Sequence, residues 1–170
     1  GVADIIRTAL VLCADHELNI SAFTARCAAS AGASPYHAVS AALAAFRGYK
    51  HGGAAQRVLA MLPDANTTDE ARALIADRLK RGESLPGFGH RLYPDGDPRA
   101  LALLRLAEKG HNKREWQRIQ RLLSAARQLL HEQPNVDFGL AAIARTYDLP
   151  DSAPTLLFAA GRTVGWIAHA

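Results

Sequence analysis

The sequence has few aromatic residues and no long apolar run. Phe, Trp and Tyr together make up 6% of its 170 residues, whereas alanine occurs 34 times. Because strands favour β-branched and aromatic side chains, a core built from Ala and Leu predicts close-packed helices rather than a β-sandwich. Nowhere do about 18 uncharged apolar residues follow one another, so we expect no membrane-spanning helix. A hydrophobic content of 49% excludes a disordered chain.

Cysteine is also scarce. Cys13 and Cys27 lie in apolar, Ala-rich surroundings, which favours two buried thiols in a reducing compartment over a disulfide. The first residues lack a basic segment followed by an apolar one, so we expect no signal peptide and a cytoplasmic location. The chain begins inside a helical pattern and stops at Ala170 while the apolar pattern still continues. This indicates a piece of a longer protein.

The net charge of +4 is too small and too dispersed for a nucleic-acid-binding surface. An Arg-rich stretch, 114–127, contains only one aromatic residue, Trp116, and therefore no stacking platform for bases. We interpret it as a solvated helix face rather than a nucleic-acid-binding helix. Sixteen of the 20 basic residues are Arg, which favours bidentate recognition of carboxylates or phosphates.

Glycines, prolines and capping residues divide the chain into helices, and no convincing β-alternation occurs. Typical signals are Ser34 before Pro35, a capping box from Thr67 to Glu70, and Asp97 before a proline. We predict an all-α protein with an irregular segment at 82–97. The predicted helices cover 1–14, 20–31, 35–46, 51–62, 68–81, 98–108, 113–132, 136–147, and the residues from 151 or 152 onward.

Three histidines lie where polar residues interrupt this pattern: His16, His51 and His90. Breaks of this kind are where loops on a rigid scaffold carry chemistry. Cys13 lies three residues before His16, but no further ligand completes a zinc set, so the sequence predicts no metal site.

The same histidines suit acid–base work on an anionic carbonyl compound. Such chemistry needs a carboxylate base, donors for carbonyl oxygens and arginines for carboxylates. Asp137, after a helix-breaking proline, is the candidate base. Arg99 and Arg162 are candidate carboxylate ligands. A surface position for Arg162, with its charged end in solvent, stays open as the alternative.

Six segments occur in the order and rough spacing of the citrate synthase family, and together they cover nearly the whole chain. They are Asp15-His-Glu-Leu-Asn19, Gly48-Tyr-Lys-His-Gly-Gly-Ala54, Pro86-Gly-Phe-Gly-His-Arg-Leu-Tyr-Pro94, Asp97-Pro-Arg-Ala100, Asn135-Val-Asp-Phe138 and Gly161-Arg-Thr-Val-Gly-Trp-Ile-Ala-His169. The chain resembles the C-terminal half of a bacterial-type enzyme without its N-terminal helices and its final tail. Each motif alone is modest, but six in order make the resemblance specific.

This resemblance implies an acyltransferase that condenses acetyl-CoA with oxaloacetate to give citrate and CoA. His51 would donate to the thioester oxygen while Asp137 removes a methyl proton. His90 would hydrogen-bond the ketone of oxaloacetate and make it electrophilic. No metal or cofactor would be needed beyond the acyl-CoA co-substrate.

The resemblance also implies the binding residues. His16, Arg99 and Arg162 would hold the carboxylates of oxaloacetate. One loop would receive the CoA adenine, and its residues are Leu85, Pro86, Gly87, Phe88 and Gly89. The family is dimeric, so we expect a homodimer in which the partner's tail supplies one more substrate arginine.

The implied fold is the multi-helical citrate synthase fold. Residues 1–50 would belong to the large domain, 51–150 to a small domain on the CoA side, and 151–170 would return to the large domain. The site would lie between the two domains.

The segment around His51 departs from the family pattern Gly-Pro-x-His-Gly-Gly-Ala-Asn-Glu, because Tyr49, Ala55 and Gln56 replace the proline, the asparagine and the acidic residue. This departure leaves open a non-catalytic relative that binds a dicarboxylate or CoA as a sensor. A 2-methylcitrate synthase, which uses propionyl-CoA, also stays open, because the two enzymes share every motif quoted above.

Overall fold

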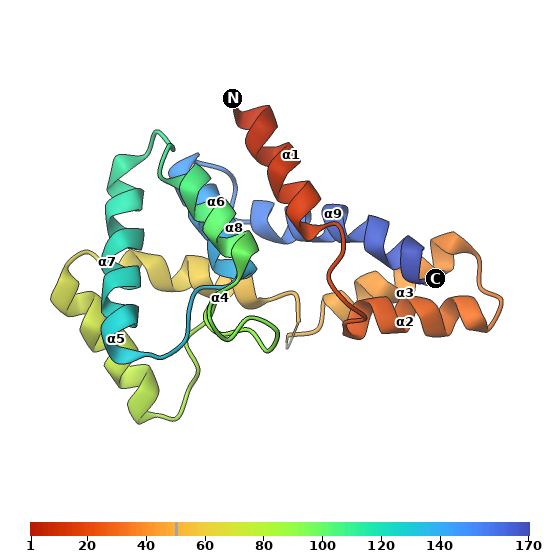
Figure 1. Cartoon of the computed structure of the whole chain (residues 1–170), viewed down its shortest axis with the longest axis horizontal. Helices are drawn as coiled ribbons and strands as arrows, with labels where there is room; N and C mark the ends of the chain where they lie inside the picture. Colours follow the sequence, from red (N-terminus) through yellow and green to blue (C-terminus); the bar gives the residue numbers. More distant parts are fainter. Residues whose placement is uncertain (50) are drawn as a thin grey trace. The chain divides into compact units, whose positions relative to one another are not determined.

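The computed structural model describes residues 1–49 and 51–170, and it is helical with no strand in these ranges (Figure 1). The predicted all-α class is confirmed. None of the described helices is long and apolar enough to cross a membrane. The described chain divides into two compact units, 1–53 with 155–170 and 54–154. The assignment of 1–50, 51–150 and 151–170 to a large and a small domain stays a prediction.

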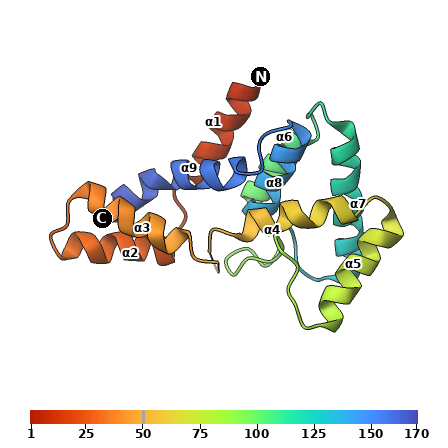
Figure 2. The same cartoon turned by 180° about the vertical axis from the view of Figure 1, so that it is seen from behind.

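The first unit contains α1 (Val2–Cys13), α2 (Ile20–Ser30), α3 (Pro35–Phe46) and nearly all of α9 (Ala153–His169). Helices α2 and α3 lie side by side as an antiparallel pair (Figures 1 and 2). Their contact is built from small side chains that are fully buried, namely Ala22, Ala25, Ala38 and Ala42. Alanine lets helices approach closely, which explains how a core with few rings can be filled.

Aromatic residues of the first unit are concentrated at one place. The Phe46 and Phe158 rings stack with centroids 5.1 Å apart, and Trp166 lies 6.1 Å from Phe46. This cluster joins α3 to α9.

The second unit contains α4 (Ala54–Met61), the 3-10 turn η1 (Leu62–Asp64), α5 (Thr68–Lys80), α6 (Pro98–Ala107), α7 (Lys113–Leu129) and α8 (Val136–Thr146). Helix α8 is the central element, because α4, α6 and α7 all pack on it and most of its side chains are buried. Helix α5 packs along α7 on the outside (Figures 1 and 2).

The predicted helix starts are confirmed where a capping residue marks them. Ser34 caps α3, Thr67 forms a capping box with Glu70, and Asp97 caps α6. Residues 81–97 contain no helix, as expected.

Three expectations were wrong. The helix expected from His51 begins at Ala54, and α7 ends at Leu129 instead of 132. Cys13 is buried but Cys27 is exposed, because Cys27 faces away from the α2–α3 contact.

Candidate functional site

Arg162 is fully buried in α9, which excludes the surface alternative. Its Nε donates to the carbonyl oxygen of Cys13 at 2.7 Å, and its guanidinium carbon lies 4.8 Å from the centre of the Phe158 ring. A buried guanidinium is costly unless hydrogen bonds or opposite charges surround it. The Arg162 side chain therefore has the environment expected of a group that binds an anion.

His51 also lies beside the Phe158 ring, and the centroids of the two rings are 6.3 Å apart. Burial of the imidazole lowers the pKa of His51 below its ordinary value, and the positive charge of Arg162 lowers it further. His51 is therefore neutral at pH 7 and can act as a hydrogen-bond donor without carrying charge.

Hydrogen bonds around the buried Ser21 indicate which ring nitrogen of His51 carries the proton when no substrate is bound. Trp166 Nε1 donates to Ser21 Oγ at 3.0 Å, and His51 Nε2 lies 2.9 Å from the same oxygen. Asn19 Oδ1 already accepts from the Ala22 N–H, so the Ser21 hydroxyl proton goes to Asn19 Oδ1, 2.8 Å away. Ser21 has no second proton to give, which leaves Nε2 of His51 as the donor.

Ser21 was not found by sequence reasoning. It lies 30 residues from His51 and 145 from Trp166, and a serine near a helix start is ordinarily a local capping residue. No pattern in the sequence connects these three side chains.

His16 lies in the loop that joins α1 to α2 and is half-buried. Its backbone N–H donates to the carboxylate of Asp15 at 2.8 Å. The first unit thus holds three of the predicted site residues, and His51 and Arg162 meet at the Phe158 ring.

Arg99 belongs to the second unit, where Asp97 holds it. Arg99 donates to this carboxylate from Nε at 3.0 Å and from one terminal nitrogen at 2.8 Å, and the Val136 N–H donates to the same carboxylate at 2.9 Å. Burial would raise the pKa of Asp97, but the hydrogen bonds and charge of Arg99 outweigh burial and lower it. Asp97 therefore stays ionised and ties the start of α6 to the start of α8.

His90 lies beside Arg99, with His90 Nε2 3.4 Å from an Arg99 terminal nitrogen. The Leu92 N–H donates to His90 Nδ1 at 3.2 Å. Because Nδ1 accepts a hydrogen bond, a neutral His90 carries its proton on Nε2. Two donors then converge, which is the arrangement that binds a carbonyl or carboxylate oxygen.

Asp137 lies in the first turn of α8, where Asn135 caps the helix by accepting from the Asp137 N–H at 3.1 Å. The same asparagine holds the predicted CoA loop. Its backbone N–H donates to the Gly87 carbonyl at 2.8 Å, and its side-chain nitrogen donates to the Gly89 carbonyl at 3.0 Å. The candidate base and the candidate CoA loop are therefore one connected structure.

Gly87 is required by this arrangement. Its φ is +81°, and a Cβ there would lie 2.6 Å from a methyl carbon of Val58 and 3.0 Å from the Cβ of Phe138. Only glycine tolerates both the backbone conformation and the close contact.

A pocket of about 450 Å³ opens beside this loop. It is lined by four of the five predicted CoA residues, Leu85, Pro86, Gly87 and Phe88. Two arginines also line it, Arg57 on α4 and Arg78 on α5, and Arg78 pairs with Glu83 at 3.2 Å. Sequence reasoning missed both arginines, because their positions on helices, 21 residues apart, gave no local signal.

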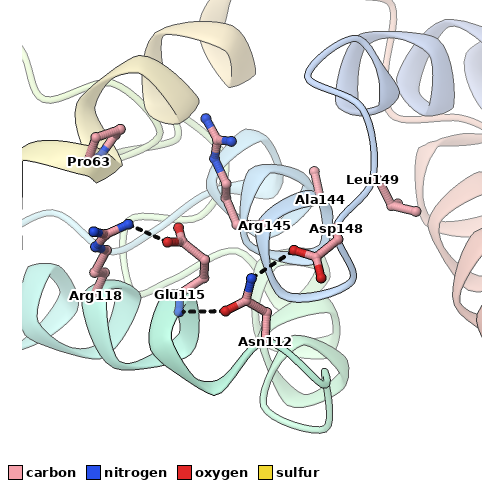
Figure 3. Close-up of a pocket in the computed structure, with 8 residues that line it drawn as sticks. All are labelled: Pro63, Asn112, Glu115, Arg118, Ala144, Arg145, Asp148 and Leu149. Carbon is pink, nitrogen blue, oxygen red and sulfur yellow. Dashed lines mark hydrogen bonds and ion pairs between the residues drawn. The ribbon is translucent and has the colours of Figure 1, made fainter.

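A second polar pocket, of about 330 Å³, lies at the start of α7 and the end of α8 (Figure 3). Its charged groups bond to one another or to neighbours. Arg118 pairs with Glu115, Asn112 donates to Asp148, and Arg145 pairs with Asp151, outside the pocket. None of the predicted site residues lines it. We interpret it as an ion-pair cluster that joins the two helices.

Among residues 1–49 and 51–170, no group of three His, Cys, Asp or Glu side chains is close enough to hold a metal ion.

Similarity to known proteins covers the whole length of the chain. The sequence model for the C-terminal domain of citrate synthase matches residues 1–170. Citrate synthase 2 of Bacillus subtilis is 36% identical over 168 residues, which cover 95% of this chain and 44% of that protein. The 2-methylcitrate synthase of Shewanella oneidensis is 33% identical over 97% of this chain and 45% of that protein. The chain thus spans a little under half the length of these relatives.

Solved structures agree. The chain aligns with a TM-score of 0.87 and 31% identity to the citrate synthase of Thermoplasma acidophilum, solved with carboxymethyl coenzyme A and oxaloacetate, covering 98% of this chain and 46% of that one. It aligns with a TM-score of 0.82 and 28% identity to the citryl-CoA lyase of Hydrogenobacter thermophilus, covering 98% of this chain and 67% of that one.

Proposed function

Because the chain belongs to the citrate synthase family over its whole length, we propose that the protein containing it condenses an acyl-CoA with oxaloacetate. The observation that carries the proposal is the pocket beside 85–88, which two arginines line and which backbone hydrogen bonds tie to the helix turn of Asp137. A pocket of this size with two cations suits a nucleotide-like ligand that carries phosphates. Asp137, the proposed base, lies two residues after Asn135, which lines this pocket.

In the proposed reaction, Asp137 removes a proton from the methyl group of the thioester. This proton is only weakly acidic, so His51 must stabilise the charge that develops on the thioester oxygen. One donor of this kind contributes about 2.7–4 kcal/mol in comparable oxyanion sites. The enolate carbon then attacks the ketone carbon of oxaloacetate, whose oxygen accepts from His90, and water cleaves the thioester to release CoA.

His51 can donate to the substrate from Nδ1 only if its Nε2 accepts instead of donating. Ser21 meets this need by turning its hydroxyl from Asn19 to His51. The ring then carries its proton on Nδ1, and Ser21 stabilises that tautomer.

Three side chains would hold the dianionic substrate. Arg99 and Arg162 each present a guanidinium whose position is fixed by hydrogen bonds, and His16 supplies a further donor. Fixed donors orient the ketone toward the enolate and cancel the charge of the two carboxylates. We further expect a cytoplasmic homodimer and no metal.

A 2-methylcitrate synthase is the second candidate, because a relative of that name is nearly as similar to this chain as the citrate synthases are. The residues quoted above serve both reactions, since the two acyl-CoA substrates differ by one methylene. Discrimination of that size amounts to about 10–200-fold in kcat/KM.

The test is a thiol-release assay on the full-length protein. We expect CoA to be released only when oxaloacetate is present, and the ratio of kcat/KM for acetyl-CoA to that for propionyl-CoA assigns the substrate. Background release with both thioesters would reject the enzyme in favour of a sensor, which calorimetry with oxaloacetate and CoA would then detect as binding alone.

A further inference from the structure

The C-terminal part of α9 lies directly against the loop that carries His16. The Gly165 N–H donates to the Ala14 carbonyl at 2.8 Å, and His169 Nε2 lies 3.1 Å from a carboxylate oxygen of Asp15. A Cβ at position 165 would lie 2.5 Å from that carbonyl oxygen and 2.8 Å from the carboxylate. Only glycine lets the helix come so close.

The Asp15 oxygen that meets His169 also accepts the backbone N–H of His16, at 2.8 Å. One carboxylate oxygen therefore connects the helix to the residue proposed to bind substrate. The residue after His16, Glu17, has a φ of +56°, which a residue other than glycine adopts only at an energetic cost. The conformation of the loop is thus stabilised by contacts from outside it.

Helix α9 also carries Arg162, whose Nε bonds to Cys13 just before the loop. The positions 162, 165 and 169 are spaced by three and four residues, so they lie on one face of the helix. This face binds Cys13, Ala14 and Asp15 in turn. It fixes Arg162 directly and His16 through Asp15.

We propose that Asp15 and His169 are positioning residues, whose hydrogen bond holds His16 where it binds a carboxylate of the substrate. The identity of that ligand rests on the proposed function, but the contact itself does not. A polar contact that solvent reaches contributes little to stability, and the side chains of Asp15 and His169 are 53% and 23% exposed. Its removal should therefore disturb His16 more than the fold.

The second unit offers a matched control. His111 Nε2 lies 2.8 Å from a carboxylate oxygen of Asp148, so this pair joins the same two residue types, and it is the more exposed of the two pairs. It joins the turn before α7 to the turn after α8, and neither turn carries a predicted site residue.

The experiment uses the full-length protein with His169→Ala, Asp15→Ala and the control His111→Ala. Calorimetry with oxaloacetate should show Kd raised about threefold to fivefold by either change in the His169 pair. KM for oxaloacetate should rise equally while kcat stays constant, and the double variant should lose no more than one single variant. His169→Gln should restore affinity because its side-chain amide can donate to Asp15. His111→Ala should bind as the parent does.

The proposal is overturned if the parent binds oxaloacetate and the His169 and Asp15 variants bind it equally well. If the parent neither binds oxaloacetate nor releases thiol, the proposed function fails by itself. In that case, the rate of amide hydrogen exchange at His16 tests the positioning role by itself. Faster exchange in both variants, but not in His111→Ala, supports the positioning role, and unchanged exchange overturns it.

Discussion

At the scale of single residues, Asp137 is the sharpest test of the proposed chemistry. Asp137→Asn keeps the size of the side chain and removes the base. We expect kcat to fall by about 10²–10⁴-fold, the contribution typical of general acid–base catalysis. Affinity for oxaloacetate should change little, because Asp137 acts only on the acyl-CoA in this reaction. Steady-state kinetics and calorimetry on the full-length protein measure the two quantities.

The matched comparison is Arg162→Leu, which should do the opposite. It removes a buried cation proposed to bind the ground state, so oxaloacetate binding should weaken by about 2–5 kcal/mol. Near-parental turnover in Asp137→Asn would show that the base is another group.

His51 allows a prediction about protonation. We expect NMR titration of the imidazole to give a pKa below the ordinary value for histidine, because burial and the charge of Arg162 both disfavour the imidazolium. Arg162→Gln should raise this pKa only in part, since burial is the larger cause. A His51 pKa unaffected by Arg162→Gln would contradict the electrostatic influence of Arg162 on the imidazole.

The sign of the linked stability effect follows from this pKa. As the pH falls through the ordinary histidine pKa, the unfolded chain takes up the proton before the folded chain does. The contribution of His51 to the free energy of unfolding therefore decreases as the pH falls below the ordinary pKa of histidine.

The sequence indicated candidate site residues where a residue type departs from the pattern expected of its helix or loop. A charged Arg162 inside an apolar helix and His51 beside two glycines both indicated a site. Ser21 was not predictable, because its role depends on side chains that only the fold brings together. The buried environment expected for Cys27 was wrong, since an Ala-rich neighbourhood in sequence does not say which side of the helix faces the core.

At the scale of elements, the loop 85–89 can be tested through its glycine. Gly87→Ala should destabilise the protein more than Gly82→Ala does. Both positions have positive φ, at +81° and +70°, which costs about 1–2 kcal/mol for a side chain. Only at Gly87 would the new Cβ meet Val58 and Phe138, which adds about 1–3 kcal/mol.

Denaturant unfolding of both variants measures the difference, and KM for acyl-CoA should rise only in Gly87→Ala. Equal unfolding free energies would mean that the loop moves away from Phe138 at little cost.

Helix starts were predictable where a capping residue marks them, whereas the helix expected from His51 begins three residues later, at Ala54; helix ends were less predictable. A start is marked by a side chain that bonds to the backbone nearby, as Thr67 and Asp97 do. The end of α7 has no such signal, and the chain leaves the helix at Leu130, four residues before Pro134, which was expected to stop it. The α8 start is capped locally by Asn135, and the carboxylate of Asp97, 39 residues away, also accepts the Val136 N–H, a contact that the sequence did not indicate.

At the scale of the whole molecule, the order of motifs predicted the family correctly, because six motifs in the same order and spacing along one chain rarely coincide by chance. The structure divides into two compact units at 53/54 and 154/155; the family resemblance implied a division at 50/51 and 150/151, and that assignment to a large and a small domain stays a prediction.

The last prediction concerns the 170-residue chain by itself. Helices α1 and α9 expose large apolar side chains to solvent, among them Val11, Leu156 and Val164, each more than 60% exposed. Exposed apolar groups on packed helices drive association. We therefore expect the isolated chain to form oligomers, and the double variant Leu156→Lys with Val164→Lys to shift it toward monomer. Leu101→Lys, a change at an equally apolar and half-exposed position on α6, is the control and should leave the oligomers intact. Light scattering across a wide concentration range measures the mass, and a monodisperse monomer for the parent chain would contradict the prediction.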